Sequence, residues 1–181
     1  DAAINPGNSG GALLNMDGEK MSNSLNNILY IRDLLDGYDG EVLRLALLSA
    51  HYRQPLNFTD EALSNAKNIL DKFYRILKKC KDVEINKKNI NNPPIKVLEA
   101  LCDDLNTSKA FAEINRIAKE LSLETKHENK IKLKEGLLAS GVLLGFFQKD
   151  PHDWLGINKA KKDLDVDSIE KLIEERTRAR E

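Results

Sequence analysis

The sequence predicts an all-α protein: a mostly antiparallel helical bundle that follows an irregular segment rich in Gly and Asn. Leu, Ile, Ala, Glu and Lys are abundant, and only 6% of the 181 residues are aromatic, a composition that favours helices. Apolar residues recur at helical spacing from residue 28 onward. Residues 1–27, by contrast, are too rich in glycine, asparagine and serine to sustain a helix.

The first predicted helices lie between residues 28 and 50. Ile31, Leu34 and Leu35 form a short amphipathic turn that Gly37 ends. The helix after it is apolar on nearly every side, so we expect most of its faces to be buried. Its apolar residues are Val42, Leu43, Leu45, Ala46, Leu47, Leu48 and Ala50.

The longest predicted helix follows Thr59, a residue type that caps helix N-termini, and its apolar positions continue to Leu77. A polar loop over residues 81–92 comes next, and Pro93 and Pro94 open the following helix. Further helices are expected over residues 95–104, 107–121, 128–147 and 166–178, with a linker that Asp150, Pro151 and Gly156 punctuate.

Charge and cysteine content narrow the classes of function. The net charge is -1, so binding to a nucleic acid would require a local arrangement of Lys and Arg. Cys80 and Cys102 each stand alone, which indicates buried reduced thiols and neither a disulfide framework nor a metal site. With no apolar run of about 18 residues and no signal peptide pattern, we expect a cytoplasmic protein that does not bind membranes.

A short loop carries the clearest chemical pattern. The stretch from Gly18 to Leu25 places a lysine, a methionine and two serine hydroxyls just before the helical region. Cationic and hydrogen-bond-donating groups on such a loop suit a triphosphate whose leaving group gains charge. A solvated turn is the alternative reading of these residues taken alone.

The surroundings of this loop resemble a known family. The segment GEKMSNSLNN resembles the KMSKS signature of class I aminoacyl-tRNA synthetases, and four later phrases resemble cysteinyl-tRNA synthetase. They are IRDLLDGYDGEVLRLALLSAHYRQPLNFTDEALSNAKNIL, DDLNTSKAFAEINRIAKE, GVLLGFFQKDPHDWL and IEKLIEERTRARE. The resemblance implies a cysteine-tRNA ligase, which uses ATP to attach cysteine to tRNA-Cys, with helices of the anticodon-binding type contacting the tRNA.

The resemblance assigns the ATP-binding loop to Lys20, Met21, Ser22, Asn23 and Ser24. Asn23 stands where the family usually has a second lysine, and a neutral amide cannot supply that charge to phosphates. Turnover is therefore expected to be impaired.

The family's HIGH motif and its zinc ligands, which lie before the signature loop, are absent from this chain. We therefore expect weak or no ATP binding, no metal site and no aminoacylation by the chain alone. The family also continues beyond the position of Glu181, which predicts a truncated C-terminal region.

Residues 1–15, DAAINPGNSGGALLN, resemble the active-site serine segment of HtrA-type trypsin-like serine proteases. The resemblance makes Ser9 the nucleophile, with the backbone N–H groups of Gly7 and Ser9 as its oxyanion hole. No triad is complete, because the histidines all lie in the synthetase-like region and are interpreted as surface or helix-end residues: His51, His127 and His152. The chain thus has the pattern of a chimera.

Binding of tRNA would use basic side chains on the helices, and the candidates are Arg44, Arg53, Arg75 and Arg116. Ordinary solvated helix faces are the alternative for each arginine. Trp154 and Phe58 could stack on bases, although isolated aromatic residues beside leucines are more often part of core packing. For the whole chain, the alternatives are a helical interaction module without RNA activity and a remnant serine endopeptidase.

The predicted organisation has four parts. A protease-like segment spans residues 1–17, the signature loop and a connecting helical turn span 18–39, the tRNA-binding helical bundle spans 40–149, and a linker with a truncated helical region spans 150–181. The expected partner is tRNA-Cys rather than DNA, and the expected state is a monomer.

Overall fold

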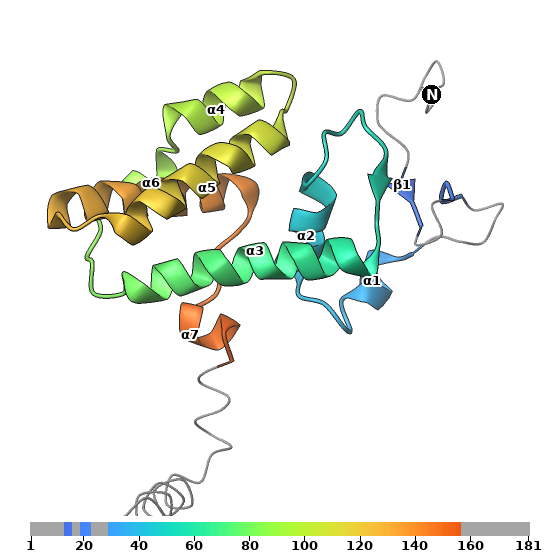
Figure 1. The fold of residues 1–181 in the computed structure, drawn as a ribbon, viewed down its shortest axis with the longest axis horizontal. Coiled ribbons are helices and arrows are strands. Elements are labelled where there is room, and N and C mark those ends of the chain that lie inside the picture. Colours follow the sequence, from blue (N-terminus) through green and yellow to red (C-terminus); the bar gives the residue numbers. More distant parts are fainter. Residues whose placement is uncertain (1–12, 16–18, 23–28, 157–181) are drawn as a thin grey trace, which may run out of the picture. The chain divides into compact units, whose positions relative to one another are not determined.

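The computed structural model describes residues 13–15, 19–22 and 29–156, and these are mostly helical (Figure 1). The chain divides into two units, Asp1–Gln148 and Lys149–Glu181. The first unit contains β1 (Leu13–Leu14), α1 (Ile31–Leu34), α2 (Gly40–Leu48), β2 (Leu56–Asn57), α3 (Asp60–Lys79), a 3-10 turn (Asn89–Asn91), α4 (Ile95–Cys102), α5 (Thr107–Leu123) and α6 (His127–Leu144). The second unit contains α7 (Pro151–Trp154). None of the helices in the described ranges combines the length and hydropathy needed to span a bilayer.

The helix starts follow the capping residues in the sequence. The Thr59 hydroxyl accepts a hydrogen bond from the backbone N–H of Ala62 at 3.2 Å, which confirms the predicted start of α3. Asp39 caps α2 and Asn106 caps α5 in the same way. Local side-chain chemistry therefore determines where these helices begin.

The all-α prediction is wrong at one point, because the first unit also contains a small sheet. Strands β1 and β2 are parallel, with Leu13 opposite Leu56 and Leu14 opposite Asn57. Two-residue strands are too short to show the alternating pattern by which a strand is detected in a sequence.

Four further expectations need correction or fall outside the description. The helix predicted over 128–147 ends at Leu144, because Gly145 adopts a left-handed conformation with φ 79°. The predicted linker contains α7, which the Asp150 side chain caps. Cys80 is buried as expected, but Cys102 is exposed. The helix predicted over 166–178 lies outside the described residues.

The helices of the first unit pack through two contact groups. Helix α2 packs on α3, and α5 contacts α3, α4 and α6. The α6 side chains also hold the loop after α3: the Glu135 carboxylate accepts from Asn86 N at 2.8 Å, and Lys134 Nζ donates to the carbonyls of Cys80 and Val83. The largest fully buried side chains are Tyr74, Phe73, Leu63, Leu70, Ile114, Leu121 and Leu137.

A buried carboxylate joins three parts of this core. Glu41, in the first turn of α2, is only 7% exposed. Its two oxygens accept hydrogen bonds from the Tyr74 hydroxyl at 3.0 Å each, from Phe147 N at 3.1 Å and from Gln148 N at 3.0 Å. The carboxylate therefore satisfies the buried Tyr74 hydroxyl of α3 and two part-buried backbone N–H groups of the segment after α6.

The segment after α6 makes a sharp turn that needs this support. Phe147 has φ 63°, an uncommon conformation for a residue with a side chain, and its ring packs edge-on against Phe73 and Tyr74. The ring also covers Gly141, where an added Cβ would lie 2.2 Å from a ring carbon. A glycine in the last turn of α6 is thus required by packing, although it costs helix propensity.

We predict that Glu41→Ala lowers the free energy of unfolding by about 3 kcal/mol, because it leaves the buried Tyr74 hydroxyl and two part-buried backbone N–H groups without their acceptor. Tyr74→Phe removes only one donor and is expected to cost about 1.5 kcal/mol. Urea unfolding monitored by circular dichroism measures both values. Glu99→Ala, at an exposed position in α4, is the matched control and should change stability by less than about 0.5 kcal/mol. Equal stability of the Glu41 and Glu99 variants would contradict the assignment.

Candidate nucleic-acid interface

The described part of the signature loop is one arm of a hairpin. Asn15 N donates to Glu19 O at 2.9 Å, Met21 N donates to Leu13 O at 2.9 Å, and the Asn15 side-chain oxygen accepts from Glu19 N at 2.9 Å. Lys20 forms an antiparallel bridge with Leu14 and is exposed. The positions of Lys20, Met21 and Ser22 are thereby described, whereas the predicted Asn23 and Ser24 lie outside the described residues.

The same hairpin is joined to the start of α3. Strand β1 pairs with β2 on its other side, and Phe58 N donates to Leu14 O at 3.0 Å. Phe58 is buried, which confirms core packing rather than base stacking for this aromatic residue. Thr59 caps α3 directly after Phe58. The hairpin arm that carries Lys20, which we call the lysine arm, is therefore joined through β1 and Phe58 to the first turn of α3.

A second polar group lies where the chain leaves α2. We call His51, Tyr52, Arg53 and Asp104 the Asp104 cluster. The Tyr52 hydroxyl donates to Asp104 Oδ1 at 2.6 Å, Arg53 Nη2 donates to the same oxygen at 3.1 Å, and Arg53 Nε lies 3.0 Å from Oδ2. His51 Nε2 lies 3.0 Å from the Asp104 carbonyl oxygen, and its ring stacks on Tyr52 with centroids 4.8 Å apart.

The Asp104 cluster holds an unusual backbone. Asp104 and the next residue, Leu105, have φ values of 54° and 52°, and consecutive left-handed residues with side chains are costly. The pKa of the Asp104 carboxyl lies below its ordinary value, first because the Tyr52 hydroxyl donates to it and then because of Arg53. The Arg53 pKa is correspondingly raised, first by its hydrogen bond to Asp104. Both groups are exposed, so solvent screens their attraction.

The structure does not bring the four predicted arginines together. Arg53 is paired within the Asp104 cluster. Arg116 on α5 is paired with Glu113 at 2.9 Å and Glu120 at 2.6 Å, which neutralises its face.

Among the described residues, the other two arginines form no ion pair with a carboxylate, and their surroundings differ. Arg44 lies over Gly145, where an added Cβ would be 3.0 Å from the Arg44 Cζ. Arg75 is exposed on α3 and belongs to a group of basic residues.

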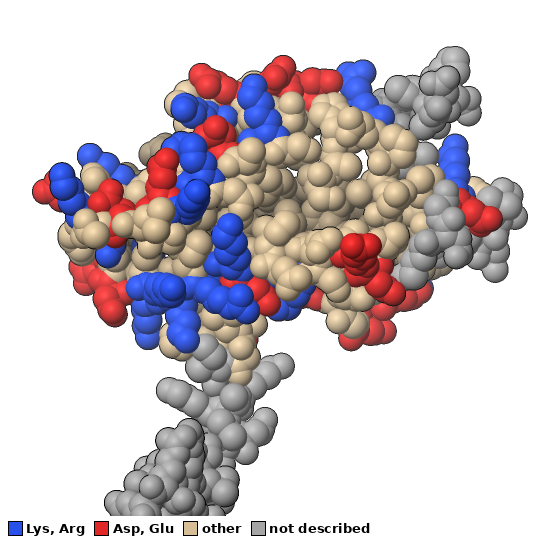
Figure 2. All heavy atoms as spheres, viewed as in Figure 1, with Lys and Arg blue, Asp and Glu red and all other residues tan. Residues whose placement is uncertain are grey.

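We define the basic face of α3 as Lys72, Arg75 and Lys79, all exposed. Figure 2 shows Lys and Arg side chains gathered over this half of α3. In the described part of the chain, none of the three forms an ion pair with a carboxylate. They span about 10 Å along the helix, and Lys79 also lies in its last turn, where cations favour the helix dipole. Lys72 and Lys79 were missed from sequence, although their spacing from Arg75 could have identified them.

The predicted nucleophile Ser9 and the predicted oxyanion-hole residue Gly7 lie outside the described residues. Among described residues, no group of three or more His, Cys, Asp or Glu side chains could hold a metal ion. His127 begins α6 and His152 lies in α7, in different units. Trp154 also lies in α7, with Lys149 Nζ 5.8 Å from its ring centroid.

Two segments of the chain match models of protein families, and we call these segments the two family ranges. Residues 10–68 match the family described as tRNA synthetases class I (C) catalytic domain, and residues 96–148 match the DALR domain. The hairpin with Lys20, helix α2 and residues 51–53 therefore lie in the first range, and Asp104 and α5 lie in the second. The Asp104 cluster joins the two ranges, and the basic face of α3 lies between them.

Curated relatives match most of the chain. It is 44% identical over 167 residues to a cysteine--tRNA ligase of Parvibaculum lavamentivorans, which covers 92% of this chain and 36% of the relative. It is 43% identical over 169 residues to the enzyme of the same name from Rhodospirillum rubrum, covering 93% of this chain and 36% of the relative. The chain thus spans about a third of the length of these relatives.

A solved structure shares the fold. The crystal structure of a LeuRS-tRNA-LeuAMS ternary complex from Agrobacterium radiobacter superposes with a TM-score of 0.56. The likeness covers 75% of this chain and 20% of that chain, at 19% sequence identity. At this identity the likeness concerns the fold alone.

The hydrogen bonds of the Asp104 cluster predict two pKa changes. Tyr52→Phe and Arg53→Ala should each raise the pKa of Asp104 toward its ordinary value, because each variant removes a hydrogen bond that lowers this pKa. A depressed carboxyl pKa contributes stability above the unfolded-state pKa, near 3.8, and that contribution is lost as the pH falls below it. Carbon-detected NMR titration of the Asp104 carboxyl measures the shifts. Arg116→Ala should leave the Asp104 pKa unchanged, and an unchanged Asp104 pKa in Tyr52→Phe would contradict the assignment.

Proposed function

We propose that this chain, a fragment of a cysteine-tRNA ligase that joins the class I catalytic end to a DALR domain, presents the signature loop to ATP and binds tRNA-Cys through its helices. The observation that carries the proposal is the identity of 44% to a cysteine--tRNA ligase over 92% of the chain. It runs through both family ranges and the segment between them.

The lysine arm supports the ATP part of the proposal. Lys20 is exposed on a hairpin that β2 holds against the start of α3, so its ammonium group can reach a ligand without disturbing the core. A cation at this position would offset the negative charge that develops on a departing diphosphate. Asn23 would supply no such charge, so we expect this loop to act more weakly than one with two lysines.

The basic face of α3 supports the tRNA part. Phosphate contacts position an RNA and need unpaired cations, and Lys72, Arg75 and Lys79 supply them on a chain with a net charge of -1. The proposal includes a bundle of the anticodon-binding type for the helices, a monomeric state and a cytoplasmic location. Zinc is a cofactor that the resemblance implies for the family enzyme.

A helical interaction module without RNA activity is the second candidate. The pairing of Arg53 with Asp104 and of Arg116 with two glutamates favours it, because neutralised arginines attract phosphates weakly. The resemblance of residues 1–15 to a serine protease segment stays a prediction. Labelling of Ser9 by a fluorophosphonate probe would be its test.

We predict that the chain prefers tRNA-Cys over a tRNA with a different anticodon, and that this preference survives moderate salt. Fluorescence anisotropy with transcripts of Parvibaculum lavamentivorans tRNA-Cys across a salt series measures it. Arg75→Ala should weaken binding and reduce the salt slope by about 0.9, the value for one phosphate contact on a duplex.

Arg116→Ala is the matched control, since it removes an arginine that already has two carboxylate partners, and it should change binding little. Equal, salt-sensitive binding of both tRNAs would favour general electrostatic attraction. Absence of binding would favour the interaction module.

We also predict that the chain alone does not activate cysteine, because the family's HIGH motif and zinc ligands are absent from it. Cysteine-dependent exchange of labelled pyrophosphate into ATP should stay at the level of a buffer blank. Exchange above the blank that is lost in Lys20→Ala would refute the prediction.

A further inference from the structure

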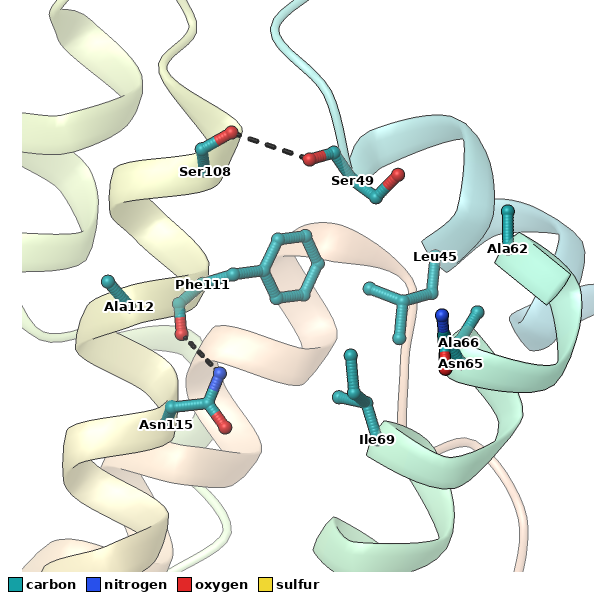
Figure 3. Close-up of a pocket in the computed structure, with 10 residues that line it drawn as sticks. All are labelled: Leu45, Ser49, Ala62, Asn65, Ala66, Ile69, Ser108, Phe111, Ala112 and Asn115. Atoms are coloured by element: carbon teal, nitrogen blue, oxygen red, sulfur yellow. Dashed lines mark hydrogen bonds between the residues drawn. The ribbon is translucent and has the colours of Figure 1, made fainter. Parts of the chain in front are cut away.

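A groove of about 490 Å³ lies between α2, α3 and α5 (Figure 3). Leu45, Ile69 and Phe111 form its apolar interior, and the Phe111 ring points into it. Small side chains on the walls leave the space between the helices unfilled, and these are Ala62, Ala66 and Ala112. A volume of this size is typical of a site for a small molecule or a single residue of a larger ligand.

The walls of the groove are tied together at one end. Ser108 Oγ donates to Ser49 O at 3.5 Å, and Thr107 Oγ1 donates to Ala50 O at 3.5 Å. The Asp104 cluster adds charged contacts between the same two segments, directly after α2 and directly before α5. These contacts join the segment after α2 to the start of α5 at one end of the groove.

Two amide side chains line the groove from opposite helices. Asn115 Nδ2 donates to Phe111 O at 3.0 Å, which leaves its amide oxygen for a ligand. Asn65 is exposed on α3, and no hydrogen bond of its amide to another described residue is found. An aromatic ring with amide donors and acceptors around it is the arrangement that stacks on a nucleobase and reads its edge.

The charge beside the groove matches a nucleic acid. Lys72 follows Ile69 by three residues and Asn65 by seven, so all three lie on one side of α3. Figure 2 shows uncharged surface over α2 and the middle of α3, between acidic side chains at the start of α3 and basic side chains over its second half. An uncharged groove beside a row of cations is complementary to a base joined to its phosphate.

We propose that this groove binds an unpaired nucleotide of RNA, with the base against Phe111 between Asn65 and Asn115 and the phosphate toward Lys72. The inference rests on the proposed function in taking tRNA as the RNA concerned. It adds a site for a base, lined by residues of both family ranges, to the phosphate contacts of the proposed function.

The test separates base contacts from phosphate contacts. Ala112→Leu fills the groove from its rim without removing a core side chain, and Phe111→Ala removes the stacking surface. Ser122→Leu adds the same bulk to an exposed site on α5 outside the groove and is the matched control. The probes are a short single-stranded oligoribonucleotide, its duplex form and a tRNA-Cys transcript, followed by fluorescence anisotropy across a salt series.

Both groove variants are expected to weaken single-strand binding about tenfold or more, the scale of one lost base–aromatic stack. Their salt slope should stay unchanged, whereas Lys72→Ala should reduce it by about 0.7 for a single strand. Duplex binding should not respond to Ala112→Leu. If Phe111→Ala fails to fold because it loses its contact with Phe146, Ala112→Leu still decides the outcome.

Three results would overturn the inference. Unchanged single-strand and tRNA binding by Ala112→Leu would show that the groove takes no nucleotide, and the proposed function would survive. Weakened assembly with the remainder of the Parvibaculum lavamentivorans ligase, at unchanged RNA affinity, would make the groove a protein interface. Failure of the parent chain to bind any of the probes would overturn the proposed function together with the inference.

Discussion

The fold of the first unit depends on the buried carboxylate of Glu41. A charged group in a core is tolerated only when its oxygens are fully hydrogen-bonded, and here the donors come from α3 and from the turn after α6. The first turn of α2 is thereby tied to a position more than a hundred residues later in the chain. Phe147, which the same contact holds, covers Gly141 and packs on α3, so the placement of α2, α3 and α6 follows from one side chain.

A second constraint acts where the two family ranges meet. Asp104 sits in a left-handed conformation that Tyr52, Arg53 and His51 hold from the other side of the junction. This arrangement joins the segment after α2 to the segment before α5, at one end of the groove between these helices. The hairpin with Lys20 is joined to the start of α3, and the basic face occupies the end of the same helix. Helix α3 therefore links the part proposed for ATP to the part proposed for RNA.

Local patterns predicted much of this architecture. Thr59 and its helical apolar spacing located α3, and the burial of Phe58 and Cys80 agreed with expectation. The sheet was missed because two-residue strands have no readable period, and the end of α6 was misplaced because Gly145 acts as a cap within an apolar run. The arginines show a different limit. Arg75 and Arg116 are alike in sequence, yet Arg75 has no carboxylate partner among the described residues and Arg116 is held by two glutamates.

Helix positions, the lysine loop and the resemblance to cysteinyl-tRNA synthetases could all be read from the order of residues, because caps, helical spacing and motifs depend on neighbours within a few positions. The contacts of Glu41, the Asp104 cluster, the pairing of each arginine and the groove at Phe111 could not. Each of these joins residues that are distant along the chain, and the free energy of a buried charge or a shared hydrogen bond depends on which groups the packed helices bring together.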